Sequence, residues 1–188
     1  MKAISIAAIV VIIIVAAGGY FGYSYYKSSQ DTGNMAISVA DAPISGVSGV
    51  YITFSAVSLH SNSSGWVNYT VSTHTIDILN LTATNASLLT NITLHAATYT
   101  MIRLYITNVT VDILGVNFNF SLNAPFAFIN HPFKISAHSS QDVLIDFNLN
   151  QDLNLNAKIF TPNVGFTVQS SLSGLSDIIF FFSNFHFD

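Results

Sequence analysis

The residues of this chain with the clearest chemistry are asparagines in Asn-x-Ser/Thr triplets, the acceptor pattern for N-linked glycans. Seven acceptors occur within residues 62–121: Asn62, Asn68, Asn80, Asn85, Asn91, Asn108 and Asn119. A chain with 17 Asn and 38 Ser and Thr residues would hold about three such triplets by chance, so composition alone explains part of the set. The excess predicts that N-glycans are attached and hydrate the surface.

Other reactive side chains do not form a known constellation. None of the six histidines has the His-x-His or His-x-x-x-His spacing that presents two metal ligands together. Asp142 and Asp146 would share a strand face roughly 13 Å apart, too far for paired acid–base chemistry. The chain has no Gly-rich phosphate loop and no Gly-x-Ser-x-Gly elbow. We therefore expect no catalytic residues, no metal site, no cofactor and no enzyme activity.

Composition restricts both the partners and the habitat. Charged residues make up 7% of the chain, Glu is absent, and the net charge is −4. Without a basic stripe, nucleic-acid binding is not expected. A domain with few carboxylates loses little stability when acid protonates them. This suggests an acidic exterior, such as that of a thermoacidophilic archaeon. Because cysteine is absent, an apolar core must stabilise the domain without disulfides.

The elements that must position the acceptors begin with a hydrophobic N-terminal segment. Residues 3–26 carry no charge, and 24 helical residues suffice for roughly 30 Å of hydrocarbon. Lys2 favours a cytoplasmic start, and five aromatic residues within 20–26 suit the outer interface. We expect an uncleaved signal anchor. The alternatives are a cleaved signal peptide and a pilin-like signal, because "MKAIS" resembles the start of archaeal pilins. All three place the domain outside the cytoplasm.

The expected organisation is an N-terminal hydrophobic segment over residues 1–27, a polar linker over 28–34 and one extracytoplasmic domain over 35–188. Alternation of apolar and polar residues dominates that domain. Short alternating runs separated by turn residues predict an all-β fold. We expect an antiparallel β-sandwich of about eight to ten strands, with one N-terminal transmembrane or signal helix.

Particular windows give more detailed expectations. Val50, Ile52 and Phe54 share one strand face, and the later phase shift predicts a β-bulge near Ala56. Strands are also expected at 102–107, 116–123, 143–150, 153–160 and 164–169. Asn119 must face solvent, because its neighbours in the strand are phenylalanines that point inward.

Two further segments are less regular. Residues 80–93 are expected to connect two strands, with one helical turn or a short helix within 85–94. Residues 177–188 form an apolar, Phe-rich run that is too short to span a bilayer. We expect either a final strand of the domain's own sheet, or a strand or aromatic plug that contacts another subunit or the membrane.

From "VADAP" at residues 39–43 onward, the chain resembles the extracytoplasmic domain of unknown function 4382 of archaeal surface proteins and bacterial lipoproteins. The resemblance spans residues 36–169 and rests on ordered motifs: Asp41-Ala42-Pro43, "VYITFSAVSLH", Gly65-Trp66, "IDILNL", "LHAATYTMIRL" with Arg103, and "LIDF" with Asp146. It implies a β-sandwich-like fold outside the cell and no established catalysis. It also implies a suspected role in carbohydrate or surface binding.

Four residues of these motifs are candidates for ligand-binding or structural roles. Asp41 precedes Ala-Pro and can cap a turn through its own backbone. Arg103 lies in a strand among apolar residues, so we expect it to pair with an aspartate, either Asp146 or Asp77. Trp66 is expected to plug one end of the sandwich or, if exposed, to stack on a sugar.

Together these features predict a non-catalytic, membrane-anchored, N-glycosylated β-sandwich module at the cell surface, with a structural or binding role. Two alternatives use the same features. The chain could be a pilin-like or strand-exchanging filament subunit, or an accessory outer subunit of a membrane complex. The expected partners are the membrane, N-linked glycans and further copies or subunits.

Overall fold

The structure is a computed structural model that describes residues 6–41 and 44–170. The Phe-rich run 177–188, for which a final strand or an assembly contact was expected, lies outside the described residues.

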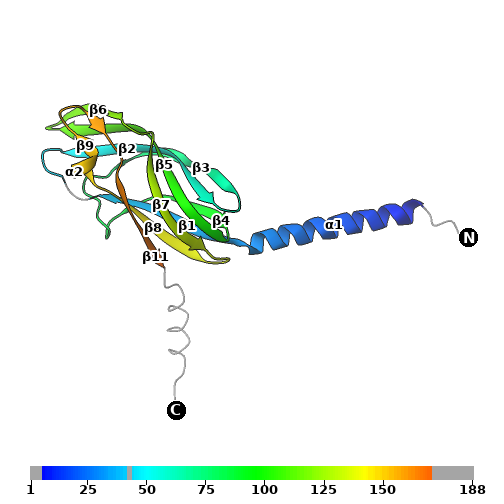
Figure 1. The fold of residues 1–188 in the computed structure, drawn as a ribbon. Coiled ribbons are helices and arrows are strands. Elements are labelled where there is room, and N and C mark those ends of the chain that lie inside the picture. The colour runs from blue at the N-terminus through cyan, green and yellow to red at the C-terminus, as the bar shows by residue number, and fades with distance from the viewer. Residues whose placement is uncertain (1–5, 42–43, 171–188) are drawn as a thin grey trace, which may run out of the picture.

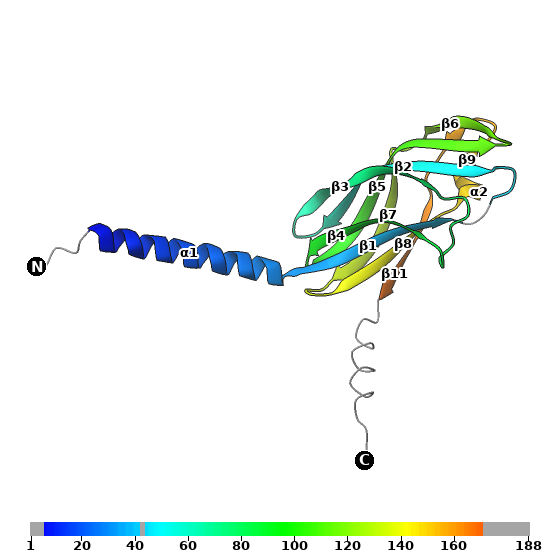
Figure 2. The ribbon, with the colours of Figure 1, turned by 180° about the vertical axis from the view of Figure 1, so that it is seen from behind.

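The described chain begins with one long helix, α1 (Ile6–Gln30), which projects away from the β domain (Figures 1 and 2). Side chains from Val10 to Tyr26 along it are exposed. No helix in the described part of the chain is both long and apolar enough to cross a membrane. The polar linker expected over residues 28–34 is not found: α1 continues through Gln30, and the first strand begins at Thr32. Residues 28–30 complete the helix and residues 32–34 pair with a neighbouring strand, so only Asp31 lies between the two elements.

Eleven strands follow in the described residues, with one short helix, α2 (Leu149–Asp152), between the eighth and ninth. They are β1 (Thr32–Asp41), β2 (Gly49–Ser61), β3 (Gly65–Asp77), β4 (Ser87–His95), β5 (Ala97–Ile113), β6 (Val116–Leu122), β7 (Phe126–Ile135), β8 (Ser140–Phe147), β9 (Leu153–Asn154), β10 (Ile159–Phe160) and β11 (Val164–Ser170). The all-β prediction is confirmed. The count exceeds ten because the expected strand at 153–160 is instead two strands of two residues each.

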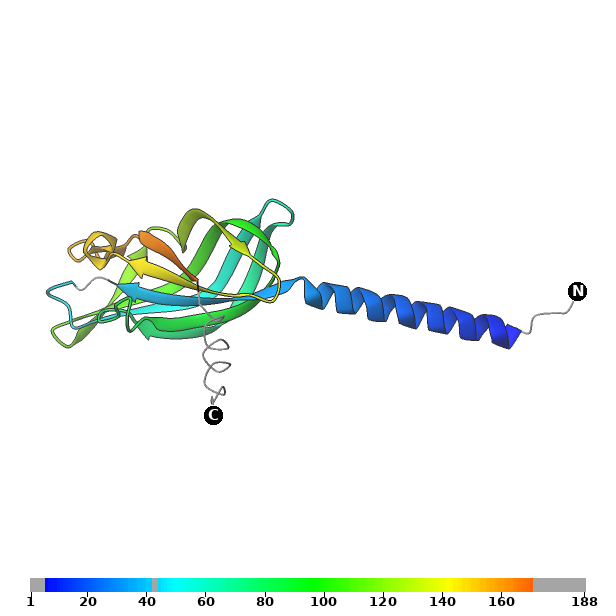
Figure 3. The same cartoon turned by 90° about the horizontal axis from the view of Figure 1, so that it is seen from below.

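The strands form two sheets that face each other (Figure 3). One sheet has the order β11-β8-β1-β4, and the other has the order β3-β2-β5-β6-β10-β9, with β7 also paired to β5. The expectation of purely antiparallel sheets is wrong, because β1 pairs with β8 and β6 pairs with β10 in parallel. A parallel pair joins segments distant in sequence, and no local turn signal marks it.

Alternating side chains build the core between the sheets. Val50, Ile52 and Phe54 of β2 are fully buried. The pairing register shifts between Phe54 and Ala56, which confirms the predicted bulge and lets Val57 and Leu59 also face inward. Across the core, the ring of Phe54 lies 6.1 Å from that of Phe147 on β8. Each such buried side chain contributes about 1.5–3 kcal/mol to folding.

The segment between β3 and β5 also differs from expectation. Residues 87–95 form strand β4, which pairs with β1 and buries Leu89, Ile92 and Leu94. The predicted connection over 80–93 is therefore shorter, and the helical turn expected within 85–94 is absent. Pairing with β1 decides the conformation of a run whose own periodicity was ambiguous.

Candidate functional site

All seven predicted glycan acceptors are exposed to solvent. They lie in the β2–β3 turn (Asn62), on β3 (Asn68), in the β3–β4 connection (Asn80 and Asn85), and on β4 (Asn91), β5 (Asn108) and β6 (Asn119). The outward orientation predicted for Asn119 is confirmed, since the neighbouring Phe120 is buried. Both sheets therefore present candidate acceptors to solvent.

Two of these acceptors share a polar cluster on the larger sheet. Thr110 Oγ1 donates a hydrogen bond to Asn119 Oδ1 at 3.1 Å and accepts one from Asn108 Nδ2 at 3.0 Å. Thr110 is also the hydroxyl residue of the Asn108 triplet. The acceptor sites on β5 and β6 are thus ordered by the strand pairing that places Asn119 opposite Thr110.

A second cluster on the same sheet is aromatic and carries one cation. The guanidinium carbon of Arg103 (β5) lies 4.0 Å from the ring centroid of Trp66 (β3) and 5.0 Å from that of Phe126 (β7). Tyr105 packs edge-on against Phe126, with ring centroids 5.5 Å apart. We call these four residues the aromatic patch. Cation–π stacking of this kind is worth about 0.5–2 kcal/mol, depending on exposure.

Strand register places the aromatic patch on the outer face. Its residue Arg103 lies between Ile102 and Leu104, which are fully buried and therefore point to the core. Side chains alternate along a strand, so Arg103 points outward. Trp66 is paired with His60, with ring centroids 5.2 Å apart, and is half-buried on this face. The expectation that Trp66 plugs one end of the sandwich is therefore wrong.

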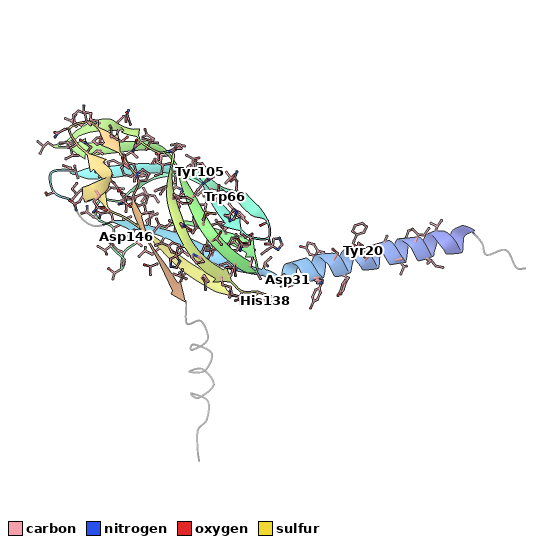
Figure 4. The ribbon with its side chains drawn as sticks, viewed as in Figure 1. Tyr20, Asp31, Trp66, Tyr105, His138 and Asp146 are labelled. Carbon is pink, nitrogen blue, oxygen red and sulfur yellow. The ribbon has the colours of Figure 1, made fainter. Side chains whose placement is uncertain are left out.

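The predicted pairing of Arg103 with an aspartate is also wrong. Within the described residues Arg103 is stacked on rings, and its Nε is buried without a hydrogen-bond partner. Asp77 instead accepts hydrogen bonds from the backbone N–H groups of Val50 and Leu79, at 3.1 and 3.2 Å. Asp146 is exposed on β8 of the other sheet, away from Trp66 (Figure 4). Sequence shows that Arg103 lies in a strand, but not which side chains the neighbouring strands place beside it.

Asp41 has a different role from the local turn cap expected of it. It is buried, and its Oδ1 accepts a hydrogen bond of 3.2 Å from the backbone N–H of Leu149 at the start of α2. Asp41 therefore ties the end of β1 to a segment 108 residues later in the chain.

Sequence reasoning missed a second buried carboxyl close to Asp41. Asp152 at the end of α2 is 1% exposed, and its Oδ1 accepts a hydrogen bond of 2.9 Å from the backbone N–H of Asn163. Burial raises the pKa of Asp152 to about 7; backbone hydrogen bonds from Asn163 and Asn148 oppose the shift, and the charge of Asp41 adds to it. Nothing in the polar run around Asp152 signals its burial.

The described residues contain no group of three or more His, Cys, Asp or Glu side chains placed to hold a metal ion. The aromatic patch is an outer sheet face on which rings and one guanidinium lie beside hydroxyl and amide groups. Such a face can pack against the C–H faces of sugars and donate hydrogen bonds to their oxygens.

Comparison with known proteins places the fold in a family. A family model described as a domain of unknown function (DUF4382) matches residues 32–167, nearly the whole β domain. Neither the curated proteins nor the solved structures contain a match. The resemblance inferred from the motifs between "VADAP" and "LIDF" is therefore confirmed. The chain belongs to the family described as domain of unknown function (DUF4382).

Proposed function

We propose that this protein is a non-catalytic, N-glycosylated β-sandwich module at the cell surface, held at the membrane by its N-terminal helix. The observation that carries the proposal is the density of accessible acceptors: the chain has seven triplets where composition predicts about three. All seven asparagines are exposed, so every triplet is accessible for glycan attachment. Exposure alone does not distinguish them, because no asparagine of the described residues is buried. The excess of triplets supports their use for glycans.

The anchor part of the proposal rests on the sequence, because no helix of the described residues alone is long and apolar enough to cross a membrane. The uncharged stretch runs over residues 3–26, of which 3–5 lie outside the described residues. As a helix it would be about 36 Å long, against roughly 30 Å of hydrocarbon. The side chains from Val10 to Val15 are at least 47% exposed. Such an apolar surface is unfavourable in water, so lipid or another protein must cover it.

The test is purification in mild detergent from the native membrane, followed by intact-mass analysis and glycopeptide mapping. The proposal predicts a chain in the membrane fraction that retains residues 1–27 and is heavier than the bare polypeptide by whole glycan units. A chain of bare polypeptide mass, or one found in the soluble cytosolic fraction, would overturn it.

A filament subunit is the second candidate, because α1 projects from the domain as a free apolar rod (Figure 1). Such a rod could pack with copies of itself. Sedimentation after detergent extraction separates the alternatives. Monomers at every concentration support a simple anchor, long homopolymers support a filament, and co-purified different subunits support an accessory role in a membrane complex.

A further inference from the structure

One glycan acceptor lies beside the aromatic patch. Trp66 and Asn68 are two residues apart on β3, so their side chains emerge from the same face roughly 7 Å apart along the strand. Asn68 is exposed and Trp66 is half-buried. Among the seven triplets, this is the one whose acceptor follows a Trp, Tyr or Phe at that spacing.

The amide of Asn68 is oriented by its cross-strand neighbour. Ser58 of β2 lies directly opposite Asn68, and its hydroxyl donates a hydrogen bond to Asn68 Oδ1. This contact holds the amide oxygen against the sheet. The amide nitrogen, to which a glycan is attached, makes no hydrogen bond within the described residues.

The same row of the sheet leads to Arg103. Ser58 pairs with Asn68 on one side and with Arg103 on the other, so all three share the outer face. Neighbouring strands are about 4.8 Å apart, which puts Arg103 roughly 10 Å from Asn68. Ser58 is only 1% exposed although it faces outward. The larger side chains on this face therefore cover Ser58. We call this covered stretch of the outer face, with Arg103 and Trp66, the floor.

The chemistry of that floor suits a sugar. The C–H faces of a pyranose pack on an aromatic ring such as Trp66, and its hydroxyl and acetamido oxygens accept hydrogen bonds. Arg103 is a planar donor with no carboxylate partner in the described part of the chain. Its Nε is buried, so the donors that a sugar would reach are the two terminal guanidinium nitrogens. A chain of sugars that starts at Asn68 would meet the ring first and the guanidinium next.

We propose that the glycan on Asn68 folds back onto the aromatic patch, with its first sugars packed on Trp66 and hydrogen-bonded to Arg103. The inference rests on the proposed function, since it requires that the chain is glycosylated. The patch is then an intramolecular sugar-binding surface, and the glycan covers apolar rings that would otherwise face solvent.

Trp66 is the only tryptophan of the chain, so its fluorescence reports directly on this site. The experiment uses the full glycosylated chain and three variants at one fixed pH. Thr70→Val removes the hydroxyl of the triplet while Asn68 keeps its contact with Ser58, and Asn68→Gln removes the acceptor itself. Ser121→Ala is the matched control, because it removes the Asn119 acceptor from the same sheet. Acrylamide quenching of Trp66 is measured, together with occupancy of each triplet by glycopeptide mapping.

The expected result is a quenching constant at least twofold higher in Thr70→Val and Asn68→Gln, with Ser121→Ala unchanged. Unchanged quenching in both variants, with Asn68 occupied in the parent chain, overturns the proposal. An increase of the same size in Ser121→Ala also overturns it. A bare Asn68 among other occupied triplets overturns this inference and leaves the proposed function standing, whereas seven bare triplets overturn both.

Discussion

The side chain of Arg103 lies between Trp66 and Phe126, and this arrangement determines how it should respond to substitution. Lysine keeps the charge but lacks the planar group that stacks on rings. We expect Arg103→Lys to lower the free energy of unfolding by about 0.5–2 kcal/mol, and by a similar amount at pH 7 and pH 3.

Urea unfolding of both proteins at the two pH values measures this effect. The informative quantity is the difference between the two proteins at each pH. If the loss disappeared at pH 3, Arg103 would be held by a carboxylate after all, as the sequence had suggested.

The contribution of Asp152 to stability changes with pH in the opposite direction to that of an ordinary paired carboxylate. Its pKa is about 7 in the folded chain, above the ordinary value of 3.8, so the folded state binds its proton more tightly than the unfolded state does. Stability is therefore fully present below about pH 4 and is lost as pH rises to about 7. The loss attributable to this group should be on the order of 2–4 kcal/mol.

Asp152→Asn should abolish most of that loss, because an amide can still accept the hydrogen bond from Asn163 and carries no charge. Denaturant unfolding at pH 4 and pH 8 checks this, with exposed Asp142→Asn as a control that should follow the parent. Parallel pH profiles of the Asp152→Asn variant and the parent would refute the assignment. The predicted advantage at low pH agrees with the acidic exterior inferred from composition.

Among the secondary-structure elements, β1 contains a glycine that lies very close to the backbone of a neighbouring segment. Gly33 is buried, and a Cβ added there would lie 2.4 Å from the backbone carbonyl oxygen of Ser136. Backbone atoms cannot move aside cheaply, so we expect Gly33→Ala to destabilise the domain by about 2 kcal/mol or more.

Gly165→Ala on β11 is the matched control, since its nearest new contact would be an ordinary 3.6 Å. That variant should stay within about 0.5 kcal/mol of the parent. Thermal unfolding of the parent and the two variants measures the melting temperature of each. Equal melting temperatures for Gly33→Ala and the parent would show that the close approach to Ser136 is not rigid.

Prediction from sequence succeeded where a strand's own alternation determines which side faces the core. The inward residues of β2 and the bulge at Ala56 follow from periodicity alone, and so does outward Asn119. It failed where the answer depends on a partner strand. The parallel pairing of β1 with β8 joins residues about 106 positions apart, and no local pattern encodes it.

The same limit explains the errors at the candidate site. Arg103 was expected to find an aspartate, but the register of β5 places it opposite Ser58 on one side and Phe128 on the other. The proximity of Trp66 to Asn68 follows from their spacing once both lie on β3, because residues two apart in a strand share a face.

For the whole molecule, a chain with five basic and nine acidic residues needs another source of surface hydration. In the proposed function, glycans on the seven exposed acceptors supply it, and the N-terminal helix holds the domain at a membrane. That proposal requires the β domain to lie on the outer side of the membrane, where N-glycans are displayed.

The location of the domain can be measured directly, because the chain contains no cysteine. Leu114, in the β5–β6 turn, is 90% exposed, so Leu114→Cys introduces one accessible thiol. Intact cells that produce this variant are treated with a membrane-impermeant maleimide, and the parent chain serves as the unlabelled control. We predict that intact and lysed cells label the variant equally. Labelling only after lysis would place the domain inside the cell and contradict a role at its surface.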